Sequence, residues 1–571
     1  MNSPFVEFLK LFSKEFGKNK KYIVAVCTLV VLAAGIGAIA PYIYGKTIDS
    51  ITQRKYEMAL GLVGVGVIID ILKTYFNSFN GKITAELIIK ISNSIRCILS
   101  EKVFRMKVEC FDKYSKGEIV NRIQESTENV VGFYIEFFKN LTMLGINLFV
   151  PLFFMFFISM KLSMFTLLTM PIIFAIVLLF QTKIKKIQEE LVKNQDKYTS
   201  YLYESLDNID GIKAYQIEEK AVLKIKKLLN DIASVFNSHL KISLVIKVIQ
   251  DHLIAIFDAM ILVISINSIS NGTLTIGEMI SFIVYLDILM GAISSLSSLS
   301  ISYKENHVNI MRIIEIEKVS LEAKGEDIGL NTIKKIEFVN LRFGYEKEKE
   351  LLKNITFKIE NPGLYVIVGE NGCGKSTILK LILKFYCCNS GELFMNDKDI
   401  NDIGSRELRN EISYLSKNNF VMRASIYENI KIVAEHATDQ EIWQALCAVG
   451  LKNFILSLDK GYNTEIGDGA LTLSSGQIQK LMLARCMLKK SSLVLLDEVT
   501  SDLDPVSESE IIKIIKELAK TKIVISVAHR TQFVNSGDFI IHIHNGTMVG
   551  IGKHEELMLH SALYKEMFGE L

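Results

Sequence analysis

The sequence has almost no excess of charge of either sign. Its 65 Lys and Arg residues are balanced by 63 Asp and Glu residues, so the net charge is only +2. Proteins that bind nucleic acid through its phosphates concentrate basic side chains, and this balance gives no bulk electrostatic case for such a partner. We therefore expect no nucleic-acid partner.

The eight cysteines lack the spacing of a metal site. Cys387 and Cys388 are adjacent, Cys373 lies in a Gly-rich loop, and the others are scattered. We expect free thiols in a reducing cytoplasm. The sequence also lacks the pattern of a cleavable signal peptide, because its first twenty residues are charged and mildly amphipathic.

Hydrophobic residues are abundant, at 49% of the 571-residue chain. Nearly all long apolar runs lie before about residue 300, and the chain is too long for one ordinary domain. We predict an all-α membrane domain of six helices with long cytoplasmic extensions over residues 1–320, followed by an α/β domain over residues 333–571. A helix needs about 20 apolar residues to cross a bilayer. Six segments qualify: 22–46, 57–78, 134–158, 162–182, 245–269 and 278–300.

A basic flank, Lys18-Asn19-Lys20-Lys21, precedes the first span and predicts a cytoplasmic N-terminus. In this orientation the outer loops are short, whereas the long, charged and helical stretches 79–133 and 183–244 lie in the cytoplasm. Segments 111–122 and 203–215 lie at turns of these extensions. They are candidates for docking on another domain or for ordinary solvated helix–turn–helix segments. A six-helix channel is the structural alternative, although a channel has no need of such extensions.

Four ionisable residues fall within the predicted spans: Asp70, Lys73, Asp258 and Asp287. Charged groups in a bilayer are costly, so each is a candidate for function. Acidic side chains facing a central cavity would suit a cationic or peptide substrate. In the alternative interpretation, Asp70 pairs with Lys73 one turn away, and the other two acids bond to Ser or Tyr of neighbouring helices.

The most specific pattern lies in the second domain. It is Gly369-Glu370-Asn371-Gly372-Cys373-Gly374-Lys375-Ser376-Thr377, which matches the phosphate-loop pattern G-x-x-x-x-G-K-[ST]. The run 365–368 before it predicts a buried strand, and 378–383 after it predicts a helix. Such a loop turns successive N–H groups towards phosphates at a helix N-terminus. We expect Lys375 on the β- and γ-phosphates and Ser376 on Mg²⁺, and we predict that the chain binds a nucleoside triphosphate.

Further candidate residues follow two more strand patterns. Leu493–Glu498 is an apolar strand that ends in Asp497, placed to bind Mg²⁺, and Glu498, placed to orient or deprotonate water. The strand pattern 522–528 ends at His529, a candidate clamp for the γ-phosphate.

Two other segments complete the candidate site. Residues 334–341 predict an edge strand that leads to Tyr345, whose ring either stacks on adenine or lies in the core. Leu473-Ser474-Ser475-Gly476-Gln477 is a Ser/Gly turn before a helix and predicts a second anion-binding N-terminus. Two phosphate-binding faces of one domain cannot both contact one nucleotide, which suggests a dimer with ATP sandwiched between two chains.

Taken in order, these residues resemble those of an ATP-binding cassette (ABC) half-transporter of the exporter type, over essentially the whole chain. The resemblance implies ATP and Mg²⁺ as cofactors, and the lipid bilayer and a second half-transporter as partners. It places the protein in the cytoplasmic membrane with its cassette in the cytoplasm, and it implies coupling roles for 111–122 and 203–215. It assigns Walker A to Gly369–Thr377, and Walker B with the catalytic glutamate to Leu493–Glu498. It assigns the D-loop to Ser501–Asp504, the switch histidine to His529 and the adenine-stacking aromatic to Tyr345. It assigns the signature to Leu473–Gln477 and the turn into the sixth helix to Asn271–Glu278.

Two positions depart from the family pattern. The signature consensus is L-S-G-G-Q, and Ser475 stands at its third position, where it either crowds the γ-phosphate pocket or adds a donor. The family's Mg²⁺-ligating glutamine falls at Lys417, in an alignment anchored by Ser425–Ile430. An ammonium cannot ligate Mg²⁺, so Lys417 is a candidate for a direct phosphate contact. Lys417 belongs to this chain's own Walker A site and Ser475 faces the partner's. This favours a heterodimer, with a homodimer as the alternative.

We therefore expect an ATP hydrolase that exports a peptide, a drug-like molecule or a lipid by alternating access. Lys375, Glu498 and His529 are the expected catalytic residues. The alternatives are an importer with an exporter-like fold, as in siderophore-type uptake, and a homodimeric lipid floppase. A soluble cassette ATPase is excluded by the six apolar spans. We expect no processing domain before the first helix, so this chain would not cut the leader of an exported peptide.

Overall fold

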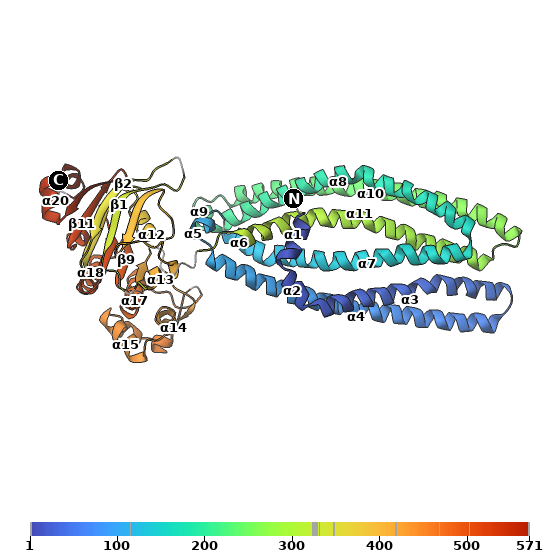
Figure 1. Ribbon diagram of the computed structural model, residues 1–571, viewed down its shortest axis with the longest axis horizontal. Helices are drawn as coiled ribbons and strands as arrows, with labels where there is room; N and C mark the ends of the chain where they lie inside the picture. Colours follow the sequence, from blue (N-terminus) through green and yellow to red (C-terminus); the bar gives the residue numbers. More distant parts are fainter. Residues whose placement is uncertain are drawn as a thin grey trace. The chain divides into compact units, whose positions relative to one another are not determined.

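The computed structural model describes residues 3–114, 116–322, 329–330, 332–346, 349–416, 420–467, 469–501 and 503–568. The chain divides into two compact units. One unit is formed by Met1–Met106 and Lys113–Val319, and the other by Lys107–Asp112 and Ser320–Leu571. Figure 1 shows the first unit as a set of long helices and the second as mixed helices and strands.

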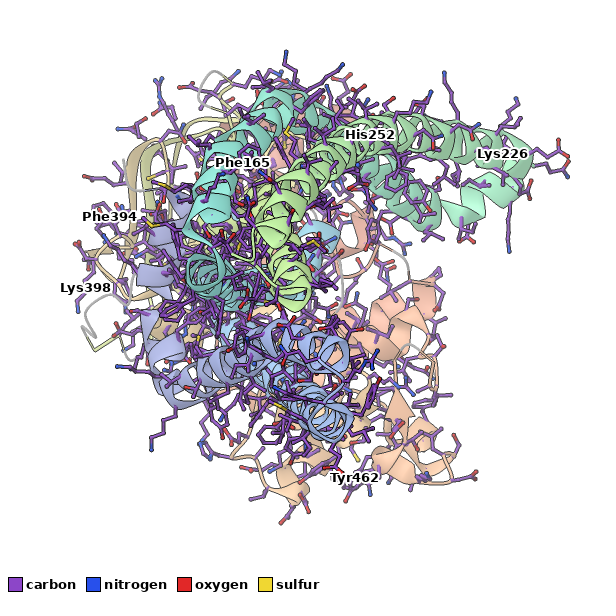
Figure 2. All side chains as sticks on the ribbon, turned by 90° about the vertical axis from the view of Figure 1, so that its right-hand side faces the viewer. Phe165, Lys226, His252, Phe394, Lys398 and Tyr462 are labelled. Carbon is purple, nitrogen blue, oxygen red and sulfur yellow. The ribbon has the colours of Figure 1, made fainter. Side chains whose placement is uncertain are left out.

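All the secondary-structure elements assigned in the described part of the first unit are helices. They are α1 (Pro4–Leu11), α2 (Ser13–Lys18), α3 (Lys20–Thr52), α4 (Tyr56–Arg105), α6 (Lys116–Asn121), the π-helical turn η1 (Arg122–Ser126), α7 (Thr127–Ile158), α8 (Met160–Asp207), α9 (Ile209–Ala214), α10 (Glu218–Ser270) and α11 (Ile276–Lys318). Exposed side chains line the outside of these helices, as Lys226 and His252 on α10 show (Figure 2).

Five helical stretches of the described residues are long and apolar enough to cross a membrane. They lie on α3, α4, α6–α7, α10 and the first part of α11, and a shorter apolar stretch, Met160–Ile172, begins α8. A helix of about 50 residues is about 75 Å long, whereas the hydrocarbon core of a bilayer is about 30 Å thick. With 50 residues in α4 and 53 in α10, these helices extend well beyond a bilayer. The count of six spans stays a prediction.

Helices α3 and α11 approach each other closely near the short turn that precedes α11. A Cβ atom at Gly45 would lie 2.3 Å from the carbonyl oxygen of Gly277, and a Cβ atom at Gly277 would lie 2.0 Å from the carbonyl oxygen of Gly45. Asp49 completes the contact, because its carboxylate accepts from Gly277 N at 2.9 Å and from Thr275 Oγ1 at 2.8 Å. Thr275 also caps α11 in a capping box with Glu278. Only glycine fits both positions without moving a backbone.

In the residues that the structure describes, the second unit forms three sheets. A six-stranded sheet has the order β12-β11-β3-β10-β9-β6, a four-stranded sheet the order β2-β1-β4-β5, and β7 pairs with β8. The strands are β1 (Ile336–Phe343), β2 (Leu352–Ile359), β3 (Gly363–Gly369), β4 (Ser390–Met395), β5 (Lys398–Asp399), β6 (Ile412–Leu415), β7 (Ala424–Ser425), β8 (Glu465–Ile466), β9 (Leu493–Asp497), β10 (Ile523–Val527), β11 (Phe539–His544) and β12 (Thr547–Gly552).

The expectation of an edge strand at 334–341 is wrong. Strand β1 lies inside the four-stranded sheet, where it is antiparallel to both β2 and β4. Its residues Ile336, Phe338 and Leu341 are fully buried. The sequence pattern could not show the second neighbour, because both partner strands lie further along the chain.

Helices make up the rest of the regular structure that is described in the second unit. They are α5 (Val108–Phe111), α12 (Lys375–Ile382), α13 (Ser405–Asn410), α14 (Ile426–Lys431), α15 (Asp439–Ala448), α16 (Lys452–Leu456), α17 (Ser475–Leu488), α18 (Pro505–Ala519), α19 (Thr531–Val534), α20 (His554–His560), α21 (Ala562–Phe568) and the 3₁₀ turn η2 (Gly461–Asn463).

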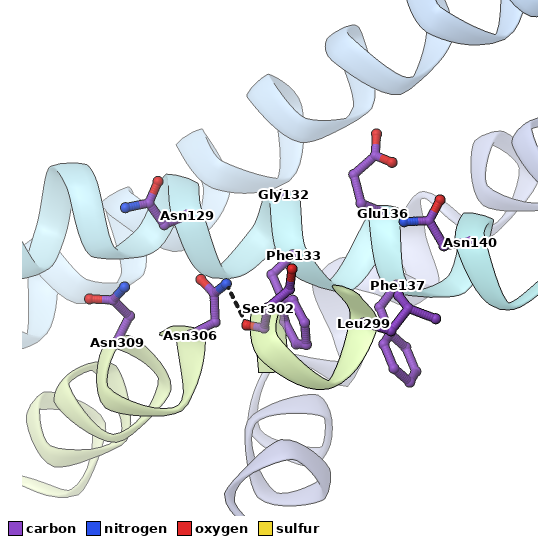
Figure 3. A pocket seen from close by; sticks show the side chains of 10 residues that line it. All are labelled: Asn129, Gly132, Phe133, Glu136, Phe137, Asn140, Leu299, Ser302, Asn306 and Asn309. Atoms are coloured by element: carbon purple, nitrogen blue, oxygen red, sulfur yellow. Dashed lines mark hydrogen bonds between the residues drawn. The ribbon is translucent and has the colours of Figure 1, made fainter. Parts of the chain in front are cut away.

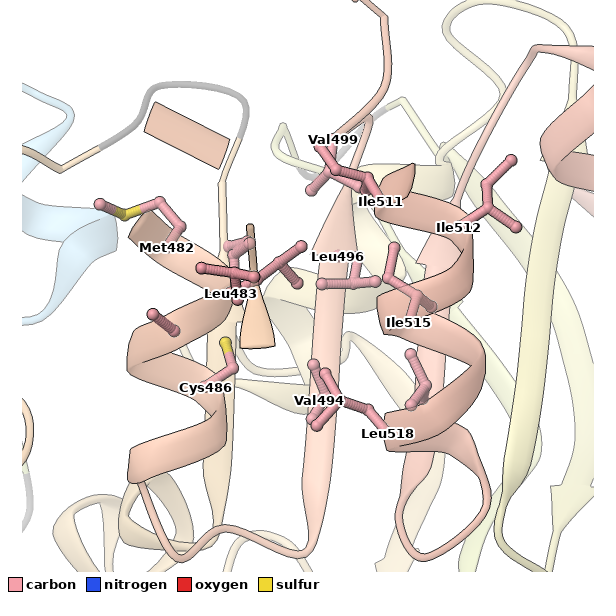
Figure 4. Close-up of a cluster of buried hydrophobic side chains, with 14 of the residues drawn as sticks. Met482, Leu483, Cys486, Val494, Leu496, Val499, Ile511, Ile512, Ile515 and Leu518 are labelled. Carbon is pink, nitrogen blue, oxygen red and sulfur yellow. The ribbon is translucent and has the colours of Figure 1, made fainter. Parts of the chain in front are cut away.

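The core of the second unit lies on both faces of its central strands. Every residue of β3, β9 and β10 is buried. Because successive strand side chains point to opposite faces, Val494 and Leu496 of β9 join one apolar cluster, whereas Leu493 and Leu495 join the other. Figure 4 shows α17 and α18 on the first of these faces, with Leu483 and Ile515 close to β9.

Because α3 and α11 approach so closely, we predict that adding a single methyl group at their contact lowers the stability of the folded protein. Gly45→Ala forces the two backbones apart and should destabilise the folded protein by about 2 kcal/mol, the usual cost of overpacking a tight contact. Gly35→Ala on the same helix is the matched control, because a Cβ atom there meets nothing within 4 Å. Thermal unfolding in detergent measures both. Equal melting temperatures for the two variants would contradict the close-contact account.

Candidate functional site

Three parallel strands bring the predicted site residues to one edge of the six-stranded sheet. Val527 at the end of β10 is paired with Ile367 of β3 on one side and with Asp497 of β9 on the other. The carboxyl ends of β3, β9 and β10 therefore lie next to one another. Each strand is followed directly by candidate residues: the phosphate loop after β3, Glu498 after β9, and His529 two positions after β10.

The loop after β3 has the backbone that a phosphate loop needs. Gly372 and Gly374 have φ angles of +80° and +101°, which favour glycine. A Cβ atom at Gly369 would lie 2.1 Å from the carbonyl oxygen of Ile543, so the chain passes too close to β11 for a side chain. Gly374 immediately precedes α12, so the loop ends at a helix N-terminus, where backbone N–H groups favour an anion.

Lys375 holds its ammonium over this loop. Its Nζ donates to the carbonyl oxygens of Gly369 and Glu370 at 2.8 and 2.7 Å, and only 5% of the residue is exposed. Burial lowers the pKa of Lys375 from its usual value, and the nearby thiol and carboxyl groups oppose that shift. These two carbonyl oxygens hold the ammonium at the loop, where its third proton can be donated to a phosphate oxygen.

Ser376 and Asp497 form the contact between the loop helix and β9. Ser376 Oγ donates to Asp497 Oδ1 at 2.7 Å. Burial raises the pKa of Asp497 above the usual range, and hydrogen bonds from Ser376 and Tyr414 act in the opposite direction. A hydroxyl and a carboxylate oxygen are ligands that Mg²⁺ prefers, and Mg²⁺ takes few protein ligands when phosphates complete its shell. These two residues fit a Mg²⁺ site.

Glu498 lies beside His529. Its Oε1 is 3.4 Å from His529 Nε2, and its backbone N–H donates to Val527 O at 3.1 Å. Glu498 has a φ angle of +51°, a left-handed conformation that is uncommon for a residue with a side chain. Such a conformation often marks a functional position, and here it coincides with the predicted catalytic carboxylate. The pair can hold a water molecule and a phosphate oxygen at the same sheet edge.

Arg530 connects the segment after β10 to the predicted D-loop. Its guanidinium donates to the carbonyl oxygens of Ser501 and Leu503 at 2.8 and 2.7 Å, and to Glu508 at 2.8 Å. Glu508 lies on α18, which begins at Pro505 and is capped by the carboxylate of Asp504. The sequence predicts that helix start. It does not predict the role of Arg530.

Tyr345 lies near the start of α12. Its hydroxyl is 3.1 Å from Thr377 Oγ1, and the residue is 53% exposed. Its ring makes edge contacts with Phe343 and Tyr386, and Lys380 Nζ is 5.7 Å from its centroid. An exposed ring face near the loop is available for stacking, and adenine stacking stays a prediction.

The signature turn lies at another helix N-terminus, that of α17. Ser474 accepts from Gln477 N, and Gln477 Oε1 accepts from Ser474 N, in a reciprocal capping box. Ser475 is exposed at the first position of the helix, and Gly476 follows it, close to Ser507. Lys417, the other departure from the family pattern, lies outside the described residues.

The three acidic candidates of the membrane helices do not form one group. Asp258 on α10 and Asp287 on α11 are close enough to interact electrostatically. Asp70 lies in a shallow groove formed by residues of α4, including Tyr75. Lys73 extends across Gly37 of α3, where a Cβ atom would lie 3.2 Å from its Cδ. A substrate role for the acids stays a prediction.

Two residues of the site were missed by sequence reasoning. Tyr414 donates to Asp497, and Arg530 holds the D-loop. Tyr414 is one aromatic residue in the short strand β6, with no spacing signal of its own. Arg530 follows His529 directly, and that adjacency is the one signal by which it could have been found.

This site geometry, in a chain that also carries membrane-length helices, defines a membrane-embedded ATPase of the cassette type. Two family models match the chain: the "ABC transporter transmembrane region" over residues 23–293 and "ABC transporter" over residues 352–501.

Curated relatives are similar over nearly the whole chain. One is the "Putative multidrug export ATP-binding/permease protein YgaD" of Bacillus subtilis (strain 168), 30% identical over 504 residues that cover 86% of this chain and 85% of the relative. Another is a "Putative export ATP-binding/permease protein" of Rickettsia felis, 27% identical and covering 99% of this chain and 98% of the relative. A solved structure, of a bacterial Atm1-family ABC exporter with ATP bound, matches with a TM-score of 0.85 at 21% identity, covering 96% of this chain and 98% of that one.

The chain belongs to the ABC transporter family, as a half-transporter of the exporter type. The fold class is confirmed as a helical transmembrane domain followed by an α/β nucleotide-binding domain. The protein is a multi-pass membrane protein that binds ATP in a domain on the cytoplasmic side and couples ATP hydrolysis to transport. The individual roles of the site residues stay predictions.

Tyr414→Phe should shift the pH dependence of ATP hydrolysis. The Tyr414 hydroxyl lowers the pKa of Asp497 by donating to its ionised form, so deleting the hydroxyl raises that pKa further. Asp497 is then protonated at a higher pH, and because a protonated carboxyl cannot ligate Mg²⁺, the pH below which hydrolysis at limiting Mg²⁺ declines should rise by roughly one unit. Tyr427→Phe is the control, because its hydroxyl donates to Asp439 on the exposed surface. The prediction fails if both profiles match wild type.

Arg530→Lys should slow hydrolysis without weakening ATP binding. Lysine keeps the charge beside Glu508, but it cannot make the same forked contacts with two carbonyl oxygens of the D-loop. We expect a rate about tenfold lower, because a displaced catalytic loop loses orientation. Gln532→Ala, which removes only a contact with Ser509, should leave the rate unchanged. A rate loss fully explained by weaker ATP binding would contradict a positioning role.

Proposed function

We propose that this chain is one half of a dimeric exporter that uses ATP to move a substrate out of the cytoplasm by alternating access. The observation that carries the proposal is the convergence at one sheet edge of Lys375, the Ser376–Asp497 contact and the Glu498–His529 pair. The same chain carries membrane-length helices. The names of the relatives, which are export proteins, support export as the direction of transport.

The proposed reaction is in-line attack of water on the γ-phosphate. Glu498 orients the water and accepts its proton, and His529 holds the γ-phosphate. Lys375 and the N–H groups of residues 369–377 stabilise the charge that develops on the phosphate oxygens. Ser376 and Asp497 would hold Mg²⁺, which neutralises charge on the β- and γ-phosphates when bound.

The second phosphate-binding face requires a partner. The turn Ser474–Gln477 caps a different helix from the phosphate loop, so we propose that it contacts ATP held by the other half-transporter. Ser475 then affects the partner's ATP site, whereas Glu498 serves this chain's own. An intact glutamate combined with an altered signature favours a heterodimer whose partner carries the altered glutamate.

The substrate classes that the proposal allows are peptides, drug-like molecules and lipids. The name of the Bacillus subtilis relative, which includes multidrug export, supports a drug-like molecule. Accumulation of substrate inside inverted membrane vesicles tests the direction. An importer would instead accumulate substrate in whole cells.

Glu498→Gln should abolish hydrolysis while ATP binding remains. The amide keeps the size of the side chain but cannot accept a proton, so the rate should fall at least about 100-fold. The measurement is MgATP hydrolysis by the chain in lipid nanodiscs, beside nucleotide binding. The control is Glu510→Gln, because Glu510 forms an exposed ion pair with Lys480. Glu508→Gln is unsuitable as a control, because Glu508 binds Arg530.

Two outcomes of this measurement distinguish a homodimer from a heterodimer. Glu498-dependent turnover by the chain alone means an active homodimer and overturns the heterodimer proposal. A folded, ATP-binding chain that does not turn over alone, but does so with a second half-transporter, supports it. Hydrolysis that persists in Glu498→Gln would contradict the proposed role of Glu498 in either form.

A further inference from the structure

A polar cavity lies between α7 and α11 within the helical unit. Its volume is about 350 Å³, and four asparagines contribute to its lining: Asn129 and Asn140 from α7, and Asn306 and Asn309 from α11 (Figure 3). These residues belong to the first part of α7 and the last part of α11. By the predicted topology those parts lie towards the cytoplasm, where a substrate for export would be taken up.

Several donor and acceptor atoms of the carboxamides around this cavity can bond to a ligand. Asn306 Nδ2 donates to Ser302 O at 3.0 Å, and Asn309 Oδ1 accepts from Ser126 Oγ at 3.1 Å, which leaves Asn306 Oδ1 and Asn309 Nδ2 for a ligand. Among the described residues, the side chains of Asn129 and Asn140 have no hydrogen-bond partner. Each carboxamide offers both a donor and an acceptor. Asn129 is exposed and the other three are half-buried, so water can bond to their free groups until a ligand takes its place.

The charge at the cavity is balanced. Glu136 lines it, and both of its oxygens accept from Lys139 Nζ, at 3.1 and 3.2 Å. Asp258 and Asp287 do not line it. Among the described side chains that line the cavity, an organic cation would therefore find no uncompensated carboxylate. Phe133, Phe137 and Leu299 add apolar surface to the lining.

We propose that this cavity binds an uncharged, amide-bearing molecule, such as a short blocked peptide or a compound of similar chemistry. A backbone amide presents an N–H and a C=O that pair with a carboxamide, and apolar side chains of the ligand meet the phenylalanines. A volume of about 350 Å³ falls within the range of small-molecule sites. The proposal rests on the proposed export function and names the substrate class that the α7–α11 cavity selects.

The test measures binding of a fluorescent, N-acetylated and C-amidated leucine tripeptide to the nucleotide-free dimer in nanodiscs. Fluorescence polarisation should give saturable binding to wild type. Asn306→Leu and Asn140→Leu, on opposite walls, should each weaken it about tenfold, because a polar group of the bound ligand loses its hydrogen-bond partner. Asn306→Gln keeps the carboxamide and should bind better than Asn306→Leu. Asn267→Leu on α10 is the matched control and should bind as wild type.

Each outcome decides the proposal. Absent binding to wild type, unchanged binding in both leucine variants, or equal competition by the cation ethidium overturns it. Elution at the dimer position in size exclusion shows which variants are folded, and if one leucine variant misfolds, the other carries the test from the opposite wall. Binding is measured without ATP, so a failure of Glu498-dependent hydrolysis would count against the proposed function and leave this result standing.

Discussion

The hydrogen bond between Ser376 and Asp497 joins the two halves of the ATP site. It connects the first turn of α12 to the end of β9, two elements separated by more than a hundred residues of chain. The contact exists because β3, β10 and β9 run parallel and in register, so that their carboxyl ends meet. Open α/β sheets bind ligands at this edge for the same reason. Lys375, Glu498 and His529 reach the site through the same register.

A similar constraint governs the membrane helices. Gly45 and Gly277 allow the backbones of α3 and α11 to touch, and Asp49 bonds across the contact to the start of α11. In a membrane, where lipid competes equally for apolar side chains, small residues and interhelical hydrogen bonds are the main means of fixing helix pairs. This contact holds one end of the α3–α11 pair, and the asparagine-lined cavity lies on the other part of α11.

Much of the cassette could be predicted from sequence because its chemistry is local. The loop 369–377 carries its glycines, lysine and hydroxyls in one continuous stretch, and the flanking apolar runs predict β3 and α12 correctly. Contacts set by tertiary structure could not be predicted. Tyr414 reaches Asp497 because β6 is the neighbour of β9, and β1 is an interior strand because β4 pairs with it. Lys73 extends over Gly37 of α3, a contact that depends on how α4 packs on α3. The four asparagines of the cavity come from two helices far apart in sequence, so no local pattern could indicate them.

The most direct measurement is MgATP hydrolysis by the dimer purified from membranes through a tag on this chain, compared between wild type and Glu498→Gln. Purification of whatever dimer forms makes the result independent of the partner's identity. The account predicts that both proteins bind ATP and that the variant loses hydrolysis at the site built by Lys375, Ser376, Asp497 and Glu498. Equal turnover by the two proteins, with equal ATP binding, would show that this sheet edge is not where this chain hydrolyses ATP.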